Sequence, residues 1–147
     1  MMTMTKAEGM GEELAETKTD LNKDDALRQK IMGFTANYEG GICRFYRMPL
    51  DTLNSLVENG LADLDDRQNE SPSIREYLGL LRKHPSEPAA LHGYLVSPDR
   101  DDCRITIEGL ECTSANKYFI SDLRSLLKNY PCGVIKIKRG HQYCWYD

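Results

Sequence analysis

Two runs of apolar and β-branched residues flank a polar turn near the middle of the chain. The runs cover residues 91–96 and 103–108, and the turn between them covers residues 97–102. Pro98 fixes one backbone torsion of this turn, and the short polar side chains around it can bond the backbone locally. The pattern predicts a central β-hairpin with a long loop.

Three further segments have the composition of strands. Residues 42–48 are rich in β formers and place Arg44 on one side of the strand and Phe45 on the other. Residues 134–138 and 141–146 alternate in polarity around a two-residue loop that ends in Gly140. Such a loop between two alternating runs is typical of a hairpin. The sequence therefore predicts one single strand and a second, C-terminal hairpin.

Apolar residues recur at helical spacing between these strands. The predicted helices run from Asp24 or Asp25 to about Tyr38, from Pro49 to Gly60, from an N-cap at Ser71 to His84, and from Thr113 or Ser114 to Tyr130. For the last of these, the alternative is an extended segment 118–120 followed by a shorter helix capped by Ser121. The whole order predicts an α+β fold: a mainly antiparallel sheet of about five strands, two hairpins plus one strand, with three to four helices packed on one face.

The charge of the chain is concentrated at its start. Residues 1–25 hold three basic and seven acidic side chains, which accounts for the whole net charge of −4, while 16 basic and 16 acidic side chains balance in the rest. Residues 1–22 have almost no large apolar side chain, so we expect a disordered acidic tail followed by a single domain over 23–147. A balanced domain does not by itself suggest an affinity for nucleic acid or membranes.

The five cysteines cannot all pair within one chain, and no secretory signal precedes them. A reduced, cytoplasmic setting is the better interpretation. No segment approaches the roughly 20 apolar residues that a membrane span requires, so we expect no membrane partner. No pair of cysteines or histidines has the short spacing of a zinc site, and we predict neither metal nor cofactor.

Four charged residues crowd the turn of the central hairpin. Asp99, Arg100, Asp101 and Asp102 could bind a divalent cation or supply an acid and a base, because hard cations need several oxygens from one short loop. The turn lacks the Gly and the distal Glu of a calcium loop, and Arg100 would repel the ion. A solvated turn whose charges cap one another is the favoured interpretation.

The C-terminal hairpin interleaves basic and aromatic residues, which is the combination that stacking on single-stranded nucleic acid requires. The alternative is a strand whose apolar side packs while its lysines keep an exposed face soluble. The candidate binding residues here, with Arg104 from the central hairpin, are Lys136, Lys138, Arg139, Tyr143 and Trp145.

No constellation in the sequence supplies a nucleophile, a base and a charge stabiliser together, so no catalytic residue is predicted. We expect a small, soluble, non-enzymatic binding or regulatory module whose partner is another protein. One alternative is a nucleic-acid-binding module that uses the C-terminal hairpin. The other is a small metal-dependent or acid/base hydrolase that uses residues 92–102, with His92 and the aspartates of the turn. We expect His92 at the surface, because it lies next to Gly93 at the head of a strand. The sequence leaves the oligomeric state open.

Overall fold

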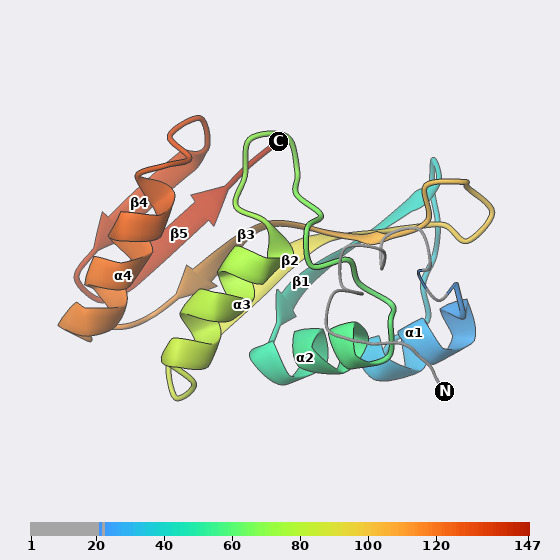
Figure 1. The fold of residues 1–147 in the computed structure, drawn as a ribbon, viewed down its shortest axis with the longest axis horizontal. Helices are drawn as coiled ribbons and strands as arrows, with labels where there is room; N and C mark the ends of the chain where they lie inside the picture. The colour runs from blue at the N-terminus through green and yellow to red at the C-terminus, as the bar shows by residue number, and fades with distance from the viewer. Residues whose placement is uncertain (1–20, 22) are drawn as a thin grey trace, which may run out of the picture.

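A computed structural model describes Leu21 and residues 23–147. Over these residues the chain forms four helices and one antiparallel sheet of five strands, whose order is β1-β2-β3-β5-β4 (Figure 1). The elements are α1 (Asp25–Met32), β1 (Ile42–Met48), α2 (Leu50–Glu58), α3 (Ile74–Lys83), β2 (Ala89–Val96), β3 (Ile105–Cys112), α4 (Lys117–Leu127), β4 (Val134–Lys138) and β5 (His141–Trp145). The expectation of a disordered tail over residues 1–22 falls outside the described residues except for Leu21.

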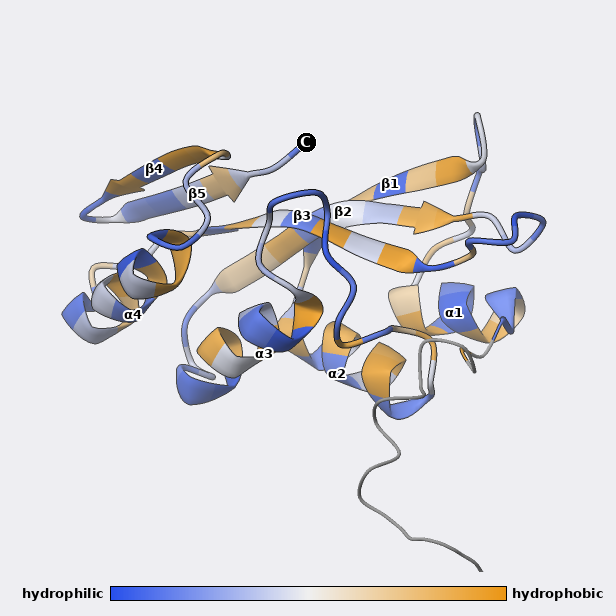
Figure 2. Ribbon diagram, turned by 45° about the horizontal axis from the view of Figure 1, so that its top comes forward, coloured by the Kyte–Doolittle hydropathy of each residue, from blue (hydrophilic) through white to orange (hydrophobic). Residues whose placement is uncertain are grey.

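The helices lie along one face of the sheet, and the other face carries no helix of the described chain (Figure 2). We call this second side the open face. Each neighbouring pair of strands is antiparallel. The predicted α+β class, with about five strands in two hairpins plus one strand and the helices on one side, is confirmed. No described helix is both long enough and apolar enough to cross a membrane.

The hydrophobic core fills the space between the helices and the sheet. One row of paired residues crosses the sheet on this side, from Leu91 through Leu110 and Cys144 to Ile135. The first three are completely buried, and Ile135 is partly buried against the core. Because strand side chains alternate between faces, the neighbours of these residues point to the open face. The alternation that predicted the strands therefore also decides which residues can form a site.

Two helix boundaries differ from the predicted ones for local reasons. Helix α1 ends at Met32, six residues before Tyr38, because Gly33 adopts a left-handed conformation with φ 85° and closes the helix. Helix α3 is capped by Ser73 and not by Ser71, since Ser73 and Glu76 form a reciprocal capping box.

Helix α4 begins at neither of the predicted positions. The Asn116 side chain accepts hydrogen bonds from the backbone N–H groups of Tyr118 and Phe119, at 2.9 and 3.1 Å, and so starts the helix at Lys117. Ser114 instead donates a hydrogen bond to the Glu87 carboxylate. Segment 118–120 is helical, with Phe119 completely buried. The extended alternative is wrong because burial of that ring requires the helix.

The C-terminal unit, residues 113–147, joins the rest of the sheet along a short seam. Strand β5 pairs with β3 only from Gly109 to Cys112, so the first half of β3 has no strand on that side. The connector between α2 and α3, residues 59–73, reaches this half. There the Asp66 carboxylate lies 3.5 Å from the Arg104 guanidinium, and Tyr94 donates a 2.9 Å hydrogen bond to Gln68. The connector thus covers what would otherwise be an open sheet edge.

Candidate functional site

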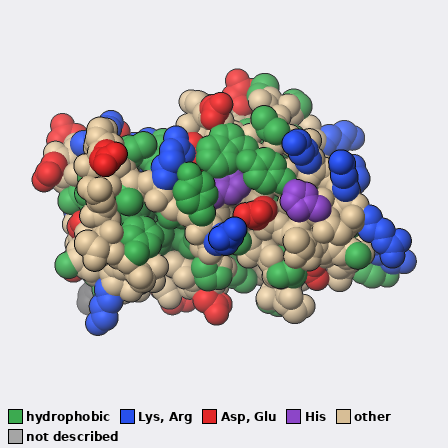
Figure 3. All heavy atoms as spheres, turned by 180° about the vertical axis from the view of Figure 1, so that it is seen from behind, with side chains coloured by type: hydrophobic (Ala, Val, Ile, Leu, Met, Phe, Trp, Pro, Cys, Tyr) green, Lys and Arg blue, Asp and Glu red, His purple; other side chains and the backbone are tan. Residues whose placement is uncertain are grey.

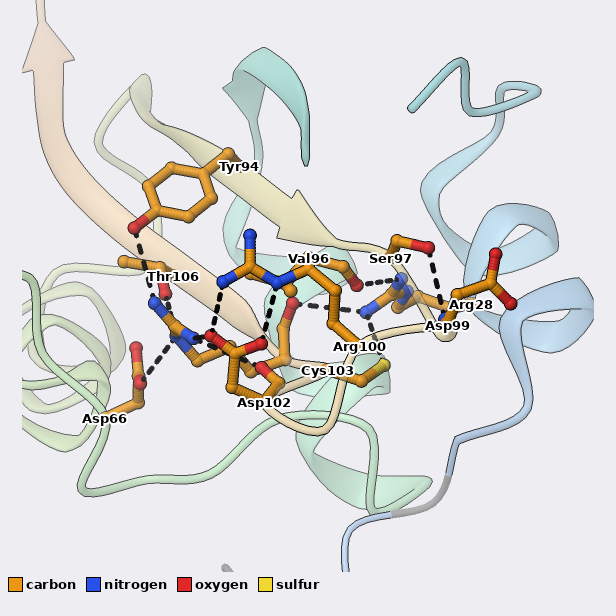
Figure 4. A network of polar contacts seen from close by, with 11 residues as sticks. Arg28, Asp66, Tyr94, Val96, Ser97, Asp99, Arg100, Asp102, Cys103 and Thr106 are labelled. Atoms are coloured by element: carbon orange, nitrogen blue, oxygen red, sulfur yellow. Dashed lines mark hydrogen bonds and ion pairs between the residues drawn. The ribbon is translucent and has the colours of Figure 1, made fainter. Parts of the chain in front are cut away.

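Two arginines at the charged turn of the central hairpin are held by the same aspartate. Arg100 donates two hydrogen bonds to the Asp102 carboxylate, at 2.8 and 2.9 Å, and Arg104 donates a third at 2.9 Å (Figure 4). These two guanidinium groups lower the pKa of Asp102. The Asp99 backbone N–H donates to the Ser97 hydroxyl at 3.1 Å. The geometry is that of a solvated turn whose charges cap one another.

A buried arginine fixes the base of this turn. Arg28 on α1 is only 2 % exposed, and it donates hydrogen bonds to the backbone carbonyls of Val96 at 2.8 Å and Arg104 at 3.2 Å. Its charge is balanced by Asp25 at 3.0 Å. Sequence analysis missed this residue, because its position in an amphipathic helix does not distinguish a buried arginine from a solvated one.

A polar hollow of about 310 Å³ lies on the open face behind the turn. Arg44, Arg100 and Arg104 line it together with Glu108 and Asp147. Each arginine already has an acidic partner: Arg44 pairs with Glu108, and the other two pair with Asp102. The arginines of the hollow are therefore compensated and do not form a site for an anion.

The predicted hydrolase residues do not converge. His92 lies five residues before Ser97 on an extended strand, which separates it by about 17 Å from the start of the turn that holds the aspartates. Within the described residues, no group of three or more histidine, cysteine or acidic side chains could hold a metal ion. The structure thus gives no support to an acid/base or metal site at residues 92–102.

His92 is buried, although its position beside Gly93 suggested a surface residue. It is 3 % exposed and lies against Gly109 of β3, where an added Cβ would come within 2.7 Å of its Nε2 atom. The missing side chain at Gly109 makes room for the imidazole directly on the sheet. Burial lowers the pKa of His92, while the Glu111 carboxylate and the Cys144 backbone oppose this shift.

Two aromatic rings of β5 lie over His92 on the open face. The Trp145 ring stacks on the imidazole with centroids 4.6 Å apart and planes 19° apart, and the Tyr143 ring does so at 5.7 Å and 22°. We call these three residues the aromatic platform. Figure 3 looks onto this face, where hydrophobic side chains cluster around a partly covered histidine and basic side chains gather toward one end.

The lysines of β4 share the face of the platform. Lys136 is the cross-strand partner of Tyr143, and Lys138 is the partner of His141. Both lysines are exposed, whereas Ile135 and Ile137 between them turn toward the helices. The predicted cluster of Lys136, Lys138, Tyr143 and Trp145 is therefore brought together on one surface.

Arg139 belongs to a different surface, and Arg104 is at the other hairpin. Arg139 lies at the β4–β5 turn and lines a groove of about 650 Å³ along the exposed side of α4. Three more cations line this basic groove: Lys117, Arg124 and Lys128. Its remaining walls come from small and apolar side chains, namely Ala115, Ile120, Ser121 and Ser125. Sequence analysis missed the groove, although the i, i+7, i+11 spacing of the three helical cations was a usable signal.

The cations of the basic groove have no acidic partner among the described residues. Arg124 donates a 3.1 Å hydrogen bond to the Ile137 carbonyl, which leaves its charge uncompensated. The acidic residue of α4, Asp122, is already held by Lys83 at 3.1 Å and His84 at 2.7 Å. The groove is therefore a concentration of unpaired positive charge.

Charge is divided unequally between the two parts of the folded chain. Residues 26–112 hold 10 basic and 14 acidic side chains, while residues 113–147 hold six basic and two acidic ones. The neutral net charge expected for the domain is thus the sum of −4 for residues 26–112 and +4 for residues 113–147. A cluster of this kind produces a local field that the total charge conceals.

Comparisons of the chain with known protein families, with curated proteins and with solved structures found no match. Function is therefore inferred from the chemistry of three surfaces: the charged turn of the central hairpin, the aromatic platform and the basic groove.

Proposed function

We propose that this chain is a non-enzymatic binding module whose C-terminal unit binds nucleic acid through its phosphate groups. The observation that carries the proposal is the basic groove, which has a volume of about 650 Å³ and is lined by four cations without acidic partners among the described residues. Lysine and arginine side chains bind phosphate oxygens, and each contact releases counterions from the nucleic acid.

The length of the groove suits several phosphates at once. Lys117 and Lys128 are eleven residues apart on a helix, a separation of about 16 Å at 1.5 Å per residue. Arg124 lies between them, and Arg139 faces them from the β4–β5 turn. A ligand with regularly spaced negative charges can therefore contact all four residues, whereas one isolated anion cannot.

A protein partner, the expectation from sequence, is the second candidate. It is favoured by exposed apolar groups on the open face, where Tyr46 is 63 % exposed and Val134 is 53 % exposed. Exposed aromatic side chains are enriched where proteins meet. Nucleic acid is preferred because it accounts for the unpaired cations as well as for the aromatic residues.

The test is fluorescence anisotropy with a labelled oligonucleotide of about 20 nucleotides at about 20 mM NaCl. The double variant Lys117→Glu/Lys128→Glu reverses two charges in the groove. Its matched control, Lys23→Glu/Lys30→Glu, makes the same change in net charge on exposed residues at the other end of the molecule (Figure 1). We expect the groove variant to bind roughly 30-fold more weakly and the control less than about threefold more weakly.

Salt dependence provides the second measurement. If four phosphates are contacted, the logarithm of the association constant should fall with the logarithm of salt concentration with a slope of about −3. Absence of binding by the unaltered protein at low salt would contradict the proposal. Equal losses in the two double variants would show that total charge, and not the groove, governs the interaction.

A further inference from the structure

We propose that the aromatic platform stacks unpaired nucleobases, so that the nucleic acid held by this module is single-stranded. This inference rests on the proposed function and adds to it the strandedness of the ligand. It assigns to the open face of the sheet the recognition of bases, and to the groove the recognition of phosphates.

The layering of the three rings is the first argument. His92 lies directly on the backbone at Gly109, and the rings of Tyr143 and Trp145 lie nearly parallel to it at 22° and 19°. Each of these rings uses one face on the imidazole, so its second face is turned away from His92, and both residues are partly exposed. The second face of Tyr143 is consequently an aromatic surface on which a base can stack, whereas a base on Trp145 must share that ring with the Arg44 guanidinium, which lies over it.

The platform is held in place before any ligand arrives. The indole N–H of Trp145 donates a 2.9 Å hydrogen bond to the Asp147 carboxylate, and the Arg44 guanidinium lies 5.8 Å from the centre of the ring. His92 stacks on both rings, and no flexible side chain lies between them. Rings that are already ordered lose little conformational entropy on binding, which favours affinity.

The positions of the cations link the platform to the groove. Lys136 stands beside Tyr143 on the neighbouring strand, Lys138 stands beside His141, and Arg139 follows at the turn and lines the groove. A strand whose bases stack on the platform can therefore keep its phosphates on positive charge as it passes around β4. Of the two acidic residues of the C-terminal unit, Asp122 is paired with Lys83 and His84, and Asp147 accepts the hydrogen bond of the Trp145 indole. Glu111 of β3 is the other cross-strand partner of Tyr143, so the phosphates must follow the β4 side of the platform.

The spacing of the rings selects against a duplex. Tyr143 and Trp145 are two residues apart on β5, which places their backbone positions about 7 Å apart. Bases stacked in a duplex are about 3.4 Å apart and are paired inside the helix, so they cannot reach two rings at this separation. A single strand can be stretched and its bases turned outward, and it then reaches both.

Trp145 makes the inference directly measurable, because it is the single tryptophan of the chain. We would titrate the protein with an oligothymidine of about 12 nucleotides, with a duplex of the same length, and with inorganic polyphosphate, which has charge but no bases. We expect all three to bind at low salt, and we expect the oligothymidine alone to quench Trp145 fluorescence strongly.

A substitution separates stacking from charge. Tyr143→Ala should weaken oligothymidine binding about tenfold and leave polyphosphate binding unchanged, because only a base uses the ring. The control Tyr118→Ala removes a tyrosine that is 67 % exposed on α4, away from the platform. Because its ring lies beside Lys117 of the groove, any change it causes should be equal for the two ligands. The quenching measurement uses the unaltered protein, so it stands even where a variant folds poorly.

The outcomes distinguish the two proposals. Binding of oligothymidine, duplex and polyphosphate with equal affinity and no quenching would overturn the platform and leave the phosphate groove standing. Failure of all three to bind at low salt would overturn the proposed function, and this inference with it. Quenching by the duplex as strong as by the single strand would overturn the selection for unpaired bases.

Discussion

The two hairpins of this sheet differ in whether their basic side chains have acidic partners. At the tip of the β2–β3 hairpin, Asp102 binds both Arg100 and Arg104, and every one of the three is compensated. Around the β4–β5 hairpin, Lys138 and Arg139 have no acidic partner in the part of the chain that the structure describes, and they lie beside the other unpaired cations of the C-terminal unit. In the sequence, the first hairpin is the more densely charged of the two.

The comparison shows that charge density along a chain is a poor guide to a binding surface. What distinguishes the two hairpins is whether neighbouring elements supply counter-charges. Asp66 from the connector and Asp102 from the turn both approach Arg104, whereas the acidic residue nearest to the groove in sequence, Asp122, is engaged with α3. Unpaired charge remains available to a ligand, and paired charge mostly contributes to local structure.

The largest effect on the free energy of unfolding is expected at the seam between β3 and β5, which joins the two hairpins. In Gly109→Ala, the new Cβ would lie 2.0 Å from the Cys144 carbonyl oxygen and 2.7 Å from the His92 ring. The β3–β5 pairing must shift, and we expect a loss of about 3 kcal/mol in the free energy of unfolding. Urea unfolding followed by circular dichroism measures it.

The matched control for the seam is Gly79→Ala on α3, where an added Cβ meets nothing within 4 Å. This change should raise the free energy of unfolding by about 0.5–1 kcal/mol, because alanine favours the helix. If Gly109→Ala were as harmless as the control, the C-terminal unit would not depend on the seam, and the two hairpins would have to be treated as independent.

The second largest effect on stability is expected at Asp66, which pairs with Arg104 of the first hairpin, and it depends on pH. Burial raises the pKa of Asp66 to about 6, despite the opposing charge of Arg104. One carboxylate oxygen, Oδ2, is buried and has no hydrogen-bond partner among the described residues. The folded state therefore binds this proton more tightly than the unfolded state does. Protonation of Asp66 stabilises the fold fully below about pH 4, and this stabilisation is lost as the pH rises through 6.

Asp66→Asn removes this titration. Between pH 4 and pH 7, we expect the unaltered protein to lose about 2 kcal/mol of unfolding free energy relative to the variant, with the change centred on the interval from 4 to 6. Parallel denaturation curves at several pH values measure the difference. A constant difference across that interval would show that Asp66 is not held in a desolvated position against β3.

The order of the elements was largely predictable, because it depends on local patterns. Alternation fixed the strand at 42–48 and the terminal hairpin, whose predicted two-residue loop ends in Gly140, with φ 86°. Helix α2 was similarly clear. The cap of α3 was misplaced because Ser71 and Ser73 are chemically equivalent in sequence, and only the Glu76 side chain distinguishes them. The placement of β5 beside β3 depends on a distant fit between Gly109, His92 and Trp145 that no local pattern records.

The candidate surfaces were predictable to different extents. Lys136, Lys138, Tyr143 and Trp145 were found because strand alternation puts them on one side. The basic groove was missed, since the start of α4 was misplaced and its cations were not read as one helical stripe. The contribution of His92 was missed as well, because a histidine next to a glycine at the head of a strand suggests a surface residue and gives no indication of a ring packed on the sheet.

A smaller effect is expected at the cap of the helix that carries the groove. Asn116→Ala removes the side chain that accepts from two backbone N–H groups at the start of α4. We expect a loss of about 1 kcal/mol in the free energy of unfolding. Thermal unfolding measures it, with Ser73→Ala at the cap of α3 as the equivalent change beneath the other hairpin. A much larger loss for Asn116→Ala would indicate that the groove helix is less well supported by packing than α3.

The smallest effect is expected when the first hairpin loses the carboxylate that compensates its arginines. Asp102→Asn leaves Arg100 without an acidic partner among the described residues and Arg104 with Asp66 alone, so the first hairpin comes closer to the second. We expect the affinity for polyphosphate at low salt to rise about twofold, and the gain to disappear at high salt. Asp101→Asn, which makes the same change in net charge one residue away, is the control. An equal gain in both variants would mean that pairing at the tip does not matter.

The connector over the first half of β3 limits how this chain can be altered. A deletion that shortened residues 59–73 would withdraw Asp66 and Gln68 from the sheet and leave the backbone groups of that half-strand facing water. An exposed row of this kind pairs readily with an extended segment of another molecule. Truncated forms of the protein should therefore self-associate through added strands before they lose their helices, and the length of an apparently featureless loop is a safeguard against aggregation.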